Sequence, residues 1–515
     1  MFQIGRPLTV VVAEGEYRLA EVGALHPAEG AGPADLPVAA FVPACPLRSL
    51  GSIEFRNDLG LEYAYVAGAM AGGISSVEMV ETLGRAGMLG IFGAGGLTPD
   101  EVEKAVDRLS RSLGHRPWGA NLIHSPGEPE LEAAVADLYL RRGVRLVEAS
   151  AYMDLTLPLV RYRVAGLHRD PSGRVVAPNR VIAKASRVEV AARFFSPPPE
   201  RFLRELRNSG FITDEQAGLA AAVPMAQDLT AEADSGGHTD NRPALTLLPI
   251  MLGLRDRMQA EHGYEQKLRV GAAGGIATPL SALAALAMGA DYVLTGSINQ
   301  AARESGASDA VREMLARAGP ADVTMAPAAD MFEMGVKVQV LKWGTMFPMR
   351  AARLYELYRT CGRLEDLPPA ERENLEKNVF RLPLDRVWEE TRAYFQVRDR
   401  RQVERAETDP KHKMALVFRW YLGQAAHWAV QGLPERKMDY QVYCGPAMGA
   451  FNEWAAGSHL ADWRNRRVVE LAMNILYGAA VHTRFYHLRL QGVALPPEMT
   501  GVRPLSLEQI EELTR

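Results

Sequence analysis

Two glycine turns close together in the sequence have the composition of a phosphate-binding site. The apolar run Arg269–Ala273 is followed by Gly274-Gly275, and the next run, Asp291–Thr295, is followed by Gly296-Ser297. Between them, Thr278-Pro279 has the residue types that begin a helix. The backbone N–H groups of both turns and of this helix start can bind one phosphate, because glycine lets the backbone approach it closely. An ordinary strand-to-helix turn remains the alternative for either glycine pair alone.

Three polar side chains, two near the predicted ends of other strands and one within a strand, could act beside these turns. His238 follows two glycines, and a histidine can donate or accept a proton near neutral pH. Lys184 could bind an anionic oxygen, and Asn121 could hydrogen-bond a ligand. The alternatives are a loop histidine, a lysine that reaches solvent and an asparagine that caps its own backbone. Three further strand-end carboxylates are expected to be solvent-exposed loop charges: Glu148, Glu232 and Asp234.

Strands and helices alternate along the part of the chain that carries these residues. Further short apolar strands are predicted at Tyr63–Val66, Met88–Phe92, Trp118–Ile123, Arg145–Glu148, Arg180–Lys184 and Leu229–Ala233. Alternation at this spacing predicts a parallel (β/α)8 barrel, in which all the loops that follow strands meet at the C-terminal mouth. A doubly wound open sheet is the competing architecture, but phosphate-binding turns after late strands favour the barrel. The sequence has neither a dinucleotide-binding G-x-G-x-x-G helix start nor a P-loop here.

We divide the chain into an N-terminal arm (1–55), the barrel (56–325), a helical accessory region (326–460), and a closing helix with a C-terminal tail (461–515). In the arm, a strand is possible only at Leu8–Ala13. After Gln300 the strand–helix alternation ends. Helices are then predicted at Met331–Leu341, Met349–Thr360, Pro369–Val379, Trp388–Val397, Lys413–Val430 and Asn465–Phe485.

Composition excludes several other classes of protein. The 515 residues carry a net charge of -4, which argues against a nucleic-acid binder that works by phosphate neutralisation. The three cysteines lie far apart, and neither a disulfide framework nor a metal-binding motif is present. The N-terminus lacks a signal-peptide pattern, and no apolar run is long enough to span a membrane. We therefore expect a cytoplasmic protein.

In their order and spacing, these segments resemble the nitronate monooxygenase and bacterial flavin enoyl reductase superfamily. The matching segments are AGAM at 67–70, GMLGIFGAGG at 87–96, SGGH at 235–238, AAGGIA at 272–277, TGS at 295–297 and LYGAA at 476–480. Within it, the stretch DMFEMGVKVQVLKWGTMFPMRAARLYELY at 330–358 resembles the trans-acting enoyl reductases of polyketide and polyunsaturated fatty acid synthases.

The resemblance implies FMN at the barrel mouth, NADPH as reductant, and a 2-enoyl thioester on an acyl carrier protein as substrate. It supports His238 as a catalytic residue, and Lys184, at the end of a predicted strand, is the second catalytic candidate. It also implies a set of cofactor-binding residues, namely Ala67, Gly68, Ala69, Met70, Asn121, Lys184, Gly236, Gly237, Ala273, Gly274, Gly275, Ile276, Gly296, Ser297 and, by a looser match, Gly445. Whether His238 gives the proton or only orients the substrate and the flavin stays open. Polyketide or fatty acid synthase components are expected partners, and a homodimer is possible.

Two other functions remain open. A nitronate monooxygenase would use the same fold with oxygen, although the helical region argues against it. A barrel enzyme without flavin could use the same turns to bind a phosphorylated substrate. If the substrate arrives on an acidic carrier protein, a basic surface near the mouth would favour docking. Candidates are Lys337, Lys342, Arg350, Arg353, Arg359, Lys411 and Lys413, and an ordinary solvated helix surface is the alternative.

Overall fold

The computed structural model describes residues 1–20, 23–25, 27, 29, 32, 35–496 and 500–514. It contains a closed barrel of parallel strands in the order β10-β11-β13-β14-β4-β5-β6-β7. In chain order these are β4 (Tyr65–Ala67), β5 (Leu89–Phe92), β6 (Gly119–Ile123), β7 (Leu146–Ser150), β10 (Arg180–Ala185), β11 (Asp228–Glu232), β13 (Arg269–Ala273) and β14 (Val293–Thr295). This confirms the predicted (β/α)8 barrel.

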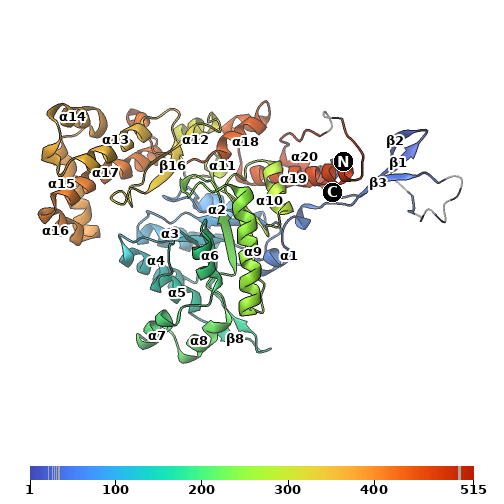
Figure 1. The fold of residues 1–515 in the computed structure, drawn as a ribbon, viewed down its shortest axis with the longest axis horizontal. Helices are drawn as coiled ribbons and strands as arrows, with labels where there is room; N and C mark the ends of the chain where they lie inside the picture. The colour runs from blue at the N-terminus through green and yellow to red at the C-terminus, as the bar shows by residue number, and fades with distance from the viewer. Residues whose placement is uncertain are drawn as a thin grey trace.

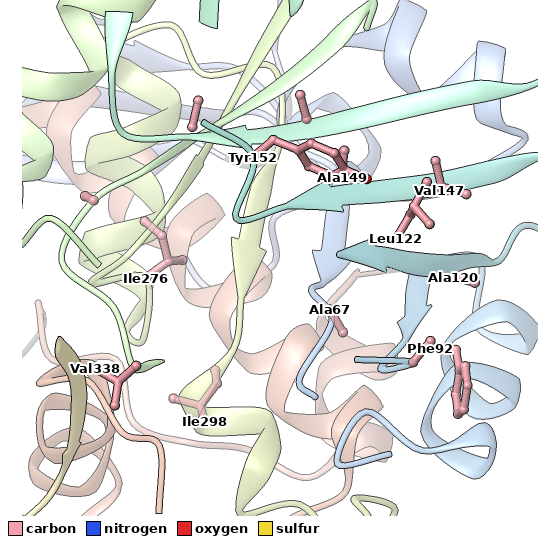
Figure 2. Packing of buried hydrophobic residues seen from close by; sticks show 14 of the residues in the cluster. Ala67, Phe92, Ala120, Leu122, Val147, Ala149, Tyr152, Ile276, Ile298 and Val338 are labelled. Atoms are coloured by element: carbon pink, nitrogen blue, oxygen red, sulfur yellow. The ribbon is translucent and has the colours of Figure 1, made fainter. Parts of the chain in front are cut away.

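Helices surround the barrel and cover the outer faces of its strands. They are α2 (Val77–Arg85), α3 (Pro99–Leu113), α4 (Pro129–Arg142), α5 (Leu157–Val164), α6 (Val188–Phe195), α9 (Ala244–His262) and α10 (Pro279–Ala287). The strands are continuous apolar runs because both of their faces are buried. Figure 2 shows part of this core, where Ala120 and Leu122 of β6 pair in register with Val147 and Ala149 of β7.

A buried ion pair lies at the N-terminal end of the barrel strands. Arg269 begins β13 and is paired in register with Asp228, the first residue of β11. Its Nε lies 2.6 Å from Oδ1 of Asp228, and its Nη1 lies 2.6 Å from Oδ2 of Asp58. These bonds tie two strands and the preceding helix α1 (Ile53–Leu59) together at this end.

The N-terminal arm is more regular than expected. Besides β1 (Leu8–Ala13), the only strand predicted there, it contains β2 (Glu16–Ala20) and β3 (Val38–Val42), which pair antiparallel on either side of β1. Apolar residues of this sheet pack against the end of helix α19 (Val468–Leu490), in a cluster of Val10, Ala40, Val42, Leu488 and Val493. Figure 1 shows this sheet projecting at one end of the molecule.

The segment after the barrel begins with a β-hairpin, so the helix predicted at Met331–Leu341 is wrong. Strands β15 (Val323–Pro327) and β16 (Lys337–Leu341) pair antiparallel, and Gly335 turns the chain between them with a φ of +72°. Alternating valines and polar residues in β16 have the period of a strand, and this pairing outweighs helical propensity. The short strand β12 (Gly237–His238) joins the edge of this hairpin.

The rest of the C-terminal half is helical, as predicted. It comprises α11 (Ser297–Gln300), α12 (Asp309–Ala316), α13 (Phe347–Thr360), α14 (Pro369–Asn374), α15 (Leu384–Arg398), α16 (Arg400–Thr408), α17 (Pro410–Gln431), α18 (Ala447–Ala455), α19 and α20 (Leu507–Thr514). Helices α13 to α17 lie at the end of the molecule opposite the N-terminal sheet (Figure 1). None of the helices in the described residues is both long and apolar enough to cross a membrane. The four-part division of the chain stays a prediction.

Candidate active site

The C-terminal ends of the barrel strands surround two adjoining cavities. The larger, of about 390 Å³, is lined by the predicted site residues Ala69, Met70, Asn121, Lys184, Gly236, Gly237 and His238. The smaller, of about 80 Å³, is lined by Gly68, Ala69, Met70, Lys184, Gly236, Ala273, Gly274, Gly275, Ile276, Gly296 and Ser297. Lys184 and Gly236 line both cavities, so the glycine turns and His238 lie in adjoining parts of one site. Most of the predicted site residues therefore meet at one mouth.

Two predicted residues lie behind the cavities. Ala67 is 1% exposed and belongs to the barrel wall. Gly445 packs backbone to backbone against the loop that carries His238, and a Cβ at Gly445 would lie 2.8 Å from the backbone nitrogen of Gly236. The N–H of Gly445 donates to Oγ of Ser297 at 3.1 Å. Gly445 is thus positioned to hold the cavity wall in place from outside.

The turn after β13 has the shape expected of an anion cradle. Gly274 and Gly275 both adopt positive φ, +83° and +78°. A Cβ on Gly274 would lie 2.5 Å from the backbone carbon of Ala233, whereas a Cβ on Gly275 would have no neighbour within 4 Å. The space over Gly275 is therefore open, and helix α10 begins just beyond it with Thr278 as its cap. A phosphate fits such an open turn beside a helix N-terminus.

Lys184 lies between two carboxylates at the centre of the mouth. Its Nζ is 2.8 Å from Oε1 of Glu232, and the two side chains are 13% and 21% exposed. Burial opposes the lysine charge, but the attraction of Glu232 and Glu148 outweighs it and raises the pKa of Lys184. Lys184 is therefore a fixed cation in the cavity wall and does not reach out to bulk solvent.

Glu148 is fully buried, so its expected exposure to solvent is wrong. It is 0% exposed because it lies in β7 facing the barrel interior, and burial raises the pKa of its carboxyl group. Oε2 accepts the N–H of Ala69 at 3.0 Å, while Oε1 is buried and has no hydrogen-bond partner among the described residues. Glu148 thus orients the β4 turn and keeps one oxygen unpaired.

Asn121 holds the neighbouring strand and does not cap its own turn. Its Nδ2 donates to the backbone oxygen of Glu148 and to Oγ of Ser150, both at 3.1 Å. Asp234 is likewise not a free loop charge, because its Oδ1 accepts from Nδ2 of Asn241 and Nε2 of Gln339, both at 2.8 Å. The polar groups of the mouth are therefore largely fixed in advance.

His238 faces the larger cavity and has a carboxylate beside it that sequence reasoning missed. Its Nε2 lies 3.3 Å from Oδ2 of Asp330, in the connection between β15 and β16. Burial opposes protonation of His238, but Asp330 outweighs it, so the pKa of His238 is raised. Apolar and polar residues alternate over Val336–Leu341, so a strand could have been predicted there, with a turn before it near Asp330. No feature of the sequence indicates that this turn contacts His238.

His124 is a second histidine of the mouth that sequence reasoning missed. It directly follows β6 and lines the larger cavity, with Nδ1 at 3.1 Å from Oε2 of buried Glu132. The hydroxyl of Tyr152 also donates to Glu132, at 3.0 Å. Lys184 is selected because it lies at the end of a predicted strand. His124 could have been selected in the same way, since His124 directly follows the predicted strand Trp118–Ile123.

A third cavity, of about 720 Å³, opens from the mouth toward the helical region. Its far wall is formed by side chains of α15 and α17, among them Tyr394, Phe395, Leu416 and Trp420. Arg398 and Glu128 line both this cavity and the mouth, and Nε of Arg398 donates to Oε1 of Glu128 at 2.7 Å. The site therefore combines a polar, glycine-rich end with a larger compartment partly lined by aromatic residues.

Comparisons with known proteins agree with this geometry. The model of the nitronate monooxygenase family matches residues 55–356, and the model of the inserted helical domain of [acyl-carrier-protein] S-malonyltransferase matches residues 361–440. Polyketide biosynthesis protein PksE of Bacillus subtilis (strain 168) is 47% identical over 453 residues, which cover 88% of this chain and 58% of PksE. A polyunsaturated fatty acid synthase protein of Thraustochytrium sp. is 48% identical over 458 residues, which cover 88% of this chain and 31% of that protein.

A solved structure is similar over its whole length. The enoyl reductase domain of MlnA, from the macrolactin biosynthesis cluster of Bacillus amyloliquefaciens, superposes with a TM-score of 0.82 and 41% identity, and the match covers 87% of this chain and 100% of that one. The chain spans under two thirds of PksE and of the polyunsaturated fatty acid synthase protein, but the whole of this domain. It belongs to the nitronate monooxygenase family, and its relatives include proteins named for polyketide biosynthesis and for a polyunsaturated fatty acid synthase.

Proposed function

We propose that this protein is an FMN-dependent enoyl reductase that uses NADPH and acts in trans on 2-enoyl thioesters carried by an acyl carrier protein, in polyketide or polyunsaturated fatty acid synthesis. The observation that carries the proposal is the similarity to the MlnA enoyl reductase domain along that domain's full length. The relatives named for polyketide biosynthesis and for a polyunsaturated fatty acid synthase support the same pathway class.

The residues at the mouth fit FMN. The open turn at Gly275 and the turn at Gly296-Ser297 would hold its phosphate with backbone N–H groups. Lys184, which lines both cavities, provides a cationic donor to the bound group. When bound, the flavin supplies the hydride chemistry that no side chain can perform.

The protein's own residues must then position the thioester and deliver one proton to it. Reduction adds hydride to the β-carbon and a proton to the α-carbon, and negative charge develops on the thioester oxygen between these events. A fixed cation such as Lys184 stabilises that charge through space. His238, whose pKa is raised and which lines the same cavity, supplies the proton. The third cavity has the volume and partly aromatic lining to receive the acyl chain.

Oxygen dependence and product identity test the proposal. We expect purified protein loaded with FMN to oxidise NADPH when given a crotonyl thioester, equally under nitrogen and in air, and to release the saturated thioester. NADPH-independent oxidation of a nitronate in air, without enoyl reduction, would instead identify a nitronate monooxygenase. Protein that is colourless and does not take up FMN would support a barrel enzyme without flavin.

A further inference from the structure

The loop that carries His238 is held by a segment from outside the barrel. Residues Gly237 and His238 pair antiparallel with Gln339 and Val338 of β16. The side chain of Gln339 also donates from Nε2 to the backbone oxygen of Ser235 at 2.8 Å. The position of the imidazole ring is therefore set by the β15–β16 hairpin as well as by the barrel.

Asp330 reaches the ring from the same hairpin. Its Oδ1 accepts the N–H of Met331 at 3.1 Å, which fixes the carboxylate, and its Oδ2 lies 3.3 Å from Nε2 of His238. Nε2 is buried, and its only polar contact among the described residues is this ion pair, in which the N–H is not aligned as a hydrogen bond. The two side chains are 34% and 51% exposed, and both line the larger cavity.

We propose that Asp330 is a positioning residue for His238, and that its carboxylate fixes the orientation of the imidazole ring and favours the protonated ring. This inference rests on the proposed function only for the role of the proton. The contact between Asp330 and His238 does not depend on which reaction the protein catalyses.

The other charged and titratable groups around the ring do not replace Asp330. Glu232 of β11 favours the protonated ring, but Lys184 of β10 opposes it, and these two are paired with each other. Tyr443 packs beside Gly237, and burial raises the pKa of its phenol, so it stays neutral. Asp330 is therefore the carboxylate on which protonation of His238 chiefly depends.

Removing this charge should change the pH dependence in a definite direction. A proton donor must be protonated, so the enoyl-reducing step slows as pH rises through the pKa of His238. Asp330→Asn lowers that pKa by about one unit, the lower end of the effect of a nearby opposite charge. Above the pKa of both proteins, enoyl reduction by the variant should be about tenfold slower, and below both pKa values the rates should converge. Flavin reduction by NADPH should not change.

The test is a histidine titration followed by NMR on the full chain labelled with nitrogen-15 histidine, with His238→Gln to assign the signal. We compare the wild type with Asp330→Asn and with the conservative Asp330→Glu. Because Asp330→Glu keeps the negative charge, its His238 pKa should lie close to that of the wild type. Glu333→Gln is the matched control, because Glu333 lies in the same connection but pairs with Arg419 at 3.3 Å. Should Asp330→Asn give too little folded protein, Asp330→Ser allows the same comparison.

The NMR and the kinetics separate the two proposals. A lower His238 pKa in Asp330→Asn but not in Glu333→Gln supports the pairing, even if the protein reduces no enoyl thioester. An unchanged His238 pKa in Asp330→Asn overturns it. If the pKa moves and the pH profile of enoyl reduction does not, the positioning role in proton donation is overturned, although the proposed reductase activity itself stands.

Discussion

The two ends of the barrel each bury a cation between carboxylates, but the pairing is complete only at the N-terminal end. There, Arg269 is 2% exposed and makes two bonds to Asp228 and one to Asp58, at 2.6 to 3.1 Å. At the mouth, Lys184 makes one bond to Glu232, and Glu148 nearby keeps a buried oxygen with no partner among the described residues.

This is the difference that we expect between an ion pair that serves the fold and the proposed functional pair of Lys184 and Glu232. A buried pair with every hydrogen bond made stabilises the fold mainly because breaking it leaves an uncompensated charge. A cluster with an unpaired oxygen costs stability, which a protein retains where a ligand completes it. The mouth of a barrel is where ligands bind, and the opposite end is where stability is determined.

The largest effect on folding is expected from Arg269→Met. It leaves the buried Asp228 without its cation, so the free energy of unfolding should fall by about 3–5 kcal/mol. Denaturant unfolding measures this directly. Activity per folded molecule should be unchanged, and a loss of less than 1 kcal/mol would remove the contrast between the two ends.

Lys184→Met should have the opposite outcome to Arg269→Met: a large loss of activity and a small loss of stability. Enoyl turnover is expected to fall by about 10²-fold or more, because the cation that stabilises developing negative charge is gone. The fold should lose much less stability than in Arg269→Met, because Glu148, whose pKa is already raised, can take up a proton. Rates of turnover and unfolding curves of both variants test this, and equal destabilisation would contradict it.

Gly275→Asp sharpens the assignment of the phosphate end. The new carboxylate occupies the open space over the turn and repels an anion there, so FMN affinity should fall about 10- to 100-fold. Titration of the apoprotein with FMN measures the change. The unfolding midpoint of the apoprotein is the control: no atom lies within 4 Å of the position that the Cβ takes, so stability should fall only by the backbone strain of a non-glycine residue at a φ of +78°, about 1–2 kcal/mol. Undiminished FMN affinity would mean that the phosphate binds elsewhere.

The smallest effects are expected on the basic surface of the helical region, where the structure changes the docking hypothesis. Arg350 pairs with Asp439, which is 0% exposed, so its reversal would disturb the fold and cannot report on docking. Arg353 is bound by Glu371 at 2.9 Å but remains 45% exposed. Arg353→Glu should cost at most about 1 kcal/mol of stability. If carriers dock here, its KM for a carrier-bound substrate should rise a few-fold, and its KM for a small crotonyl thioester should not.

The barrel was predictable because its strands are local signals. Arg269–Ala273 is predicted and observed with the same bounds, since a parallel strand buried on both faces is a continuous apolar run that ends in a glycine turn. In a parallel barrel the C-terminal ends of all strands meet at one mouth, and this rule correctly predicted that Lys184, Asn121 and His238 lie together. Their roles stay predictions until the variants are measured.

The parts that could not be predicted depend on contacts between distant segments. The strand Lys337–Leu341 pairs with Val323–Pro327 on one edge and, on the other, with Gly237 and His238, about a hundred residues earlier, so the helix predicted at Met331–Leu341 is wrong. Glu148 ends a predicted strand, and only barrel closure determines that its side chain is buried. Asp330 belongs to the site for the same reason, because the hairpin folds back over the mouth.

An anaerobic single turnover tests the central claim most directly. Purified protein carrying FMN is first reduced with one equivalent of NADPH in the absence of oxygen, and a crotonyl thioester is then mixed in while the flavin absorbance is followed. An enoyl reductase should show bleaching on the first addition, full recovery on the second, and one equivalent of saturated thioester. Flavin that stays reduced with the thioester, and recovers only when oxygen is admitted, would contradict the proposed function.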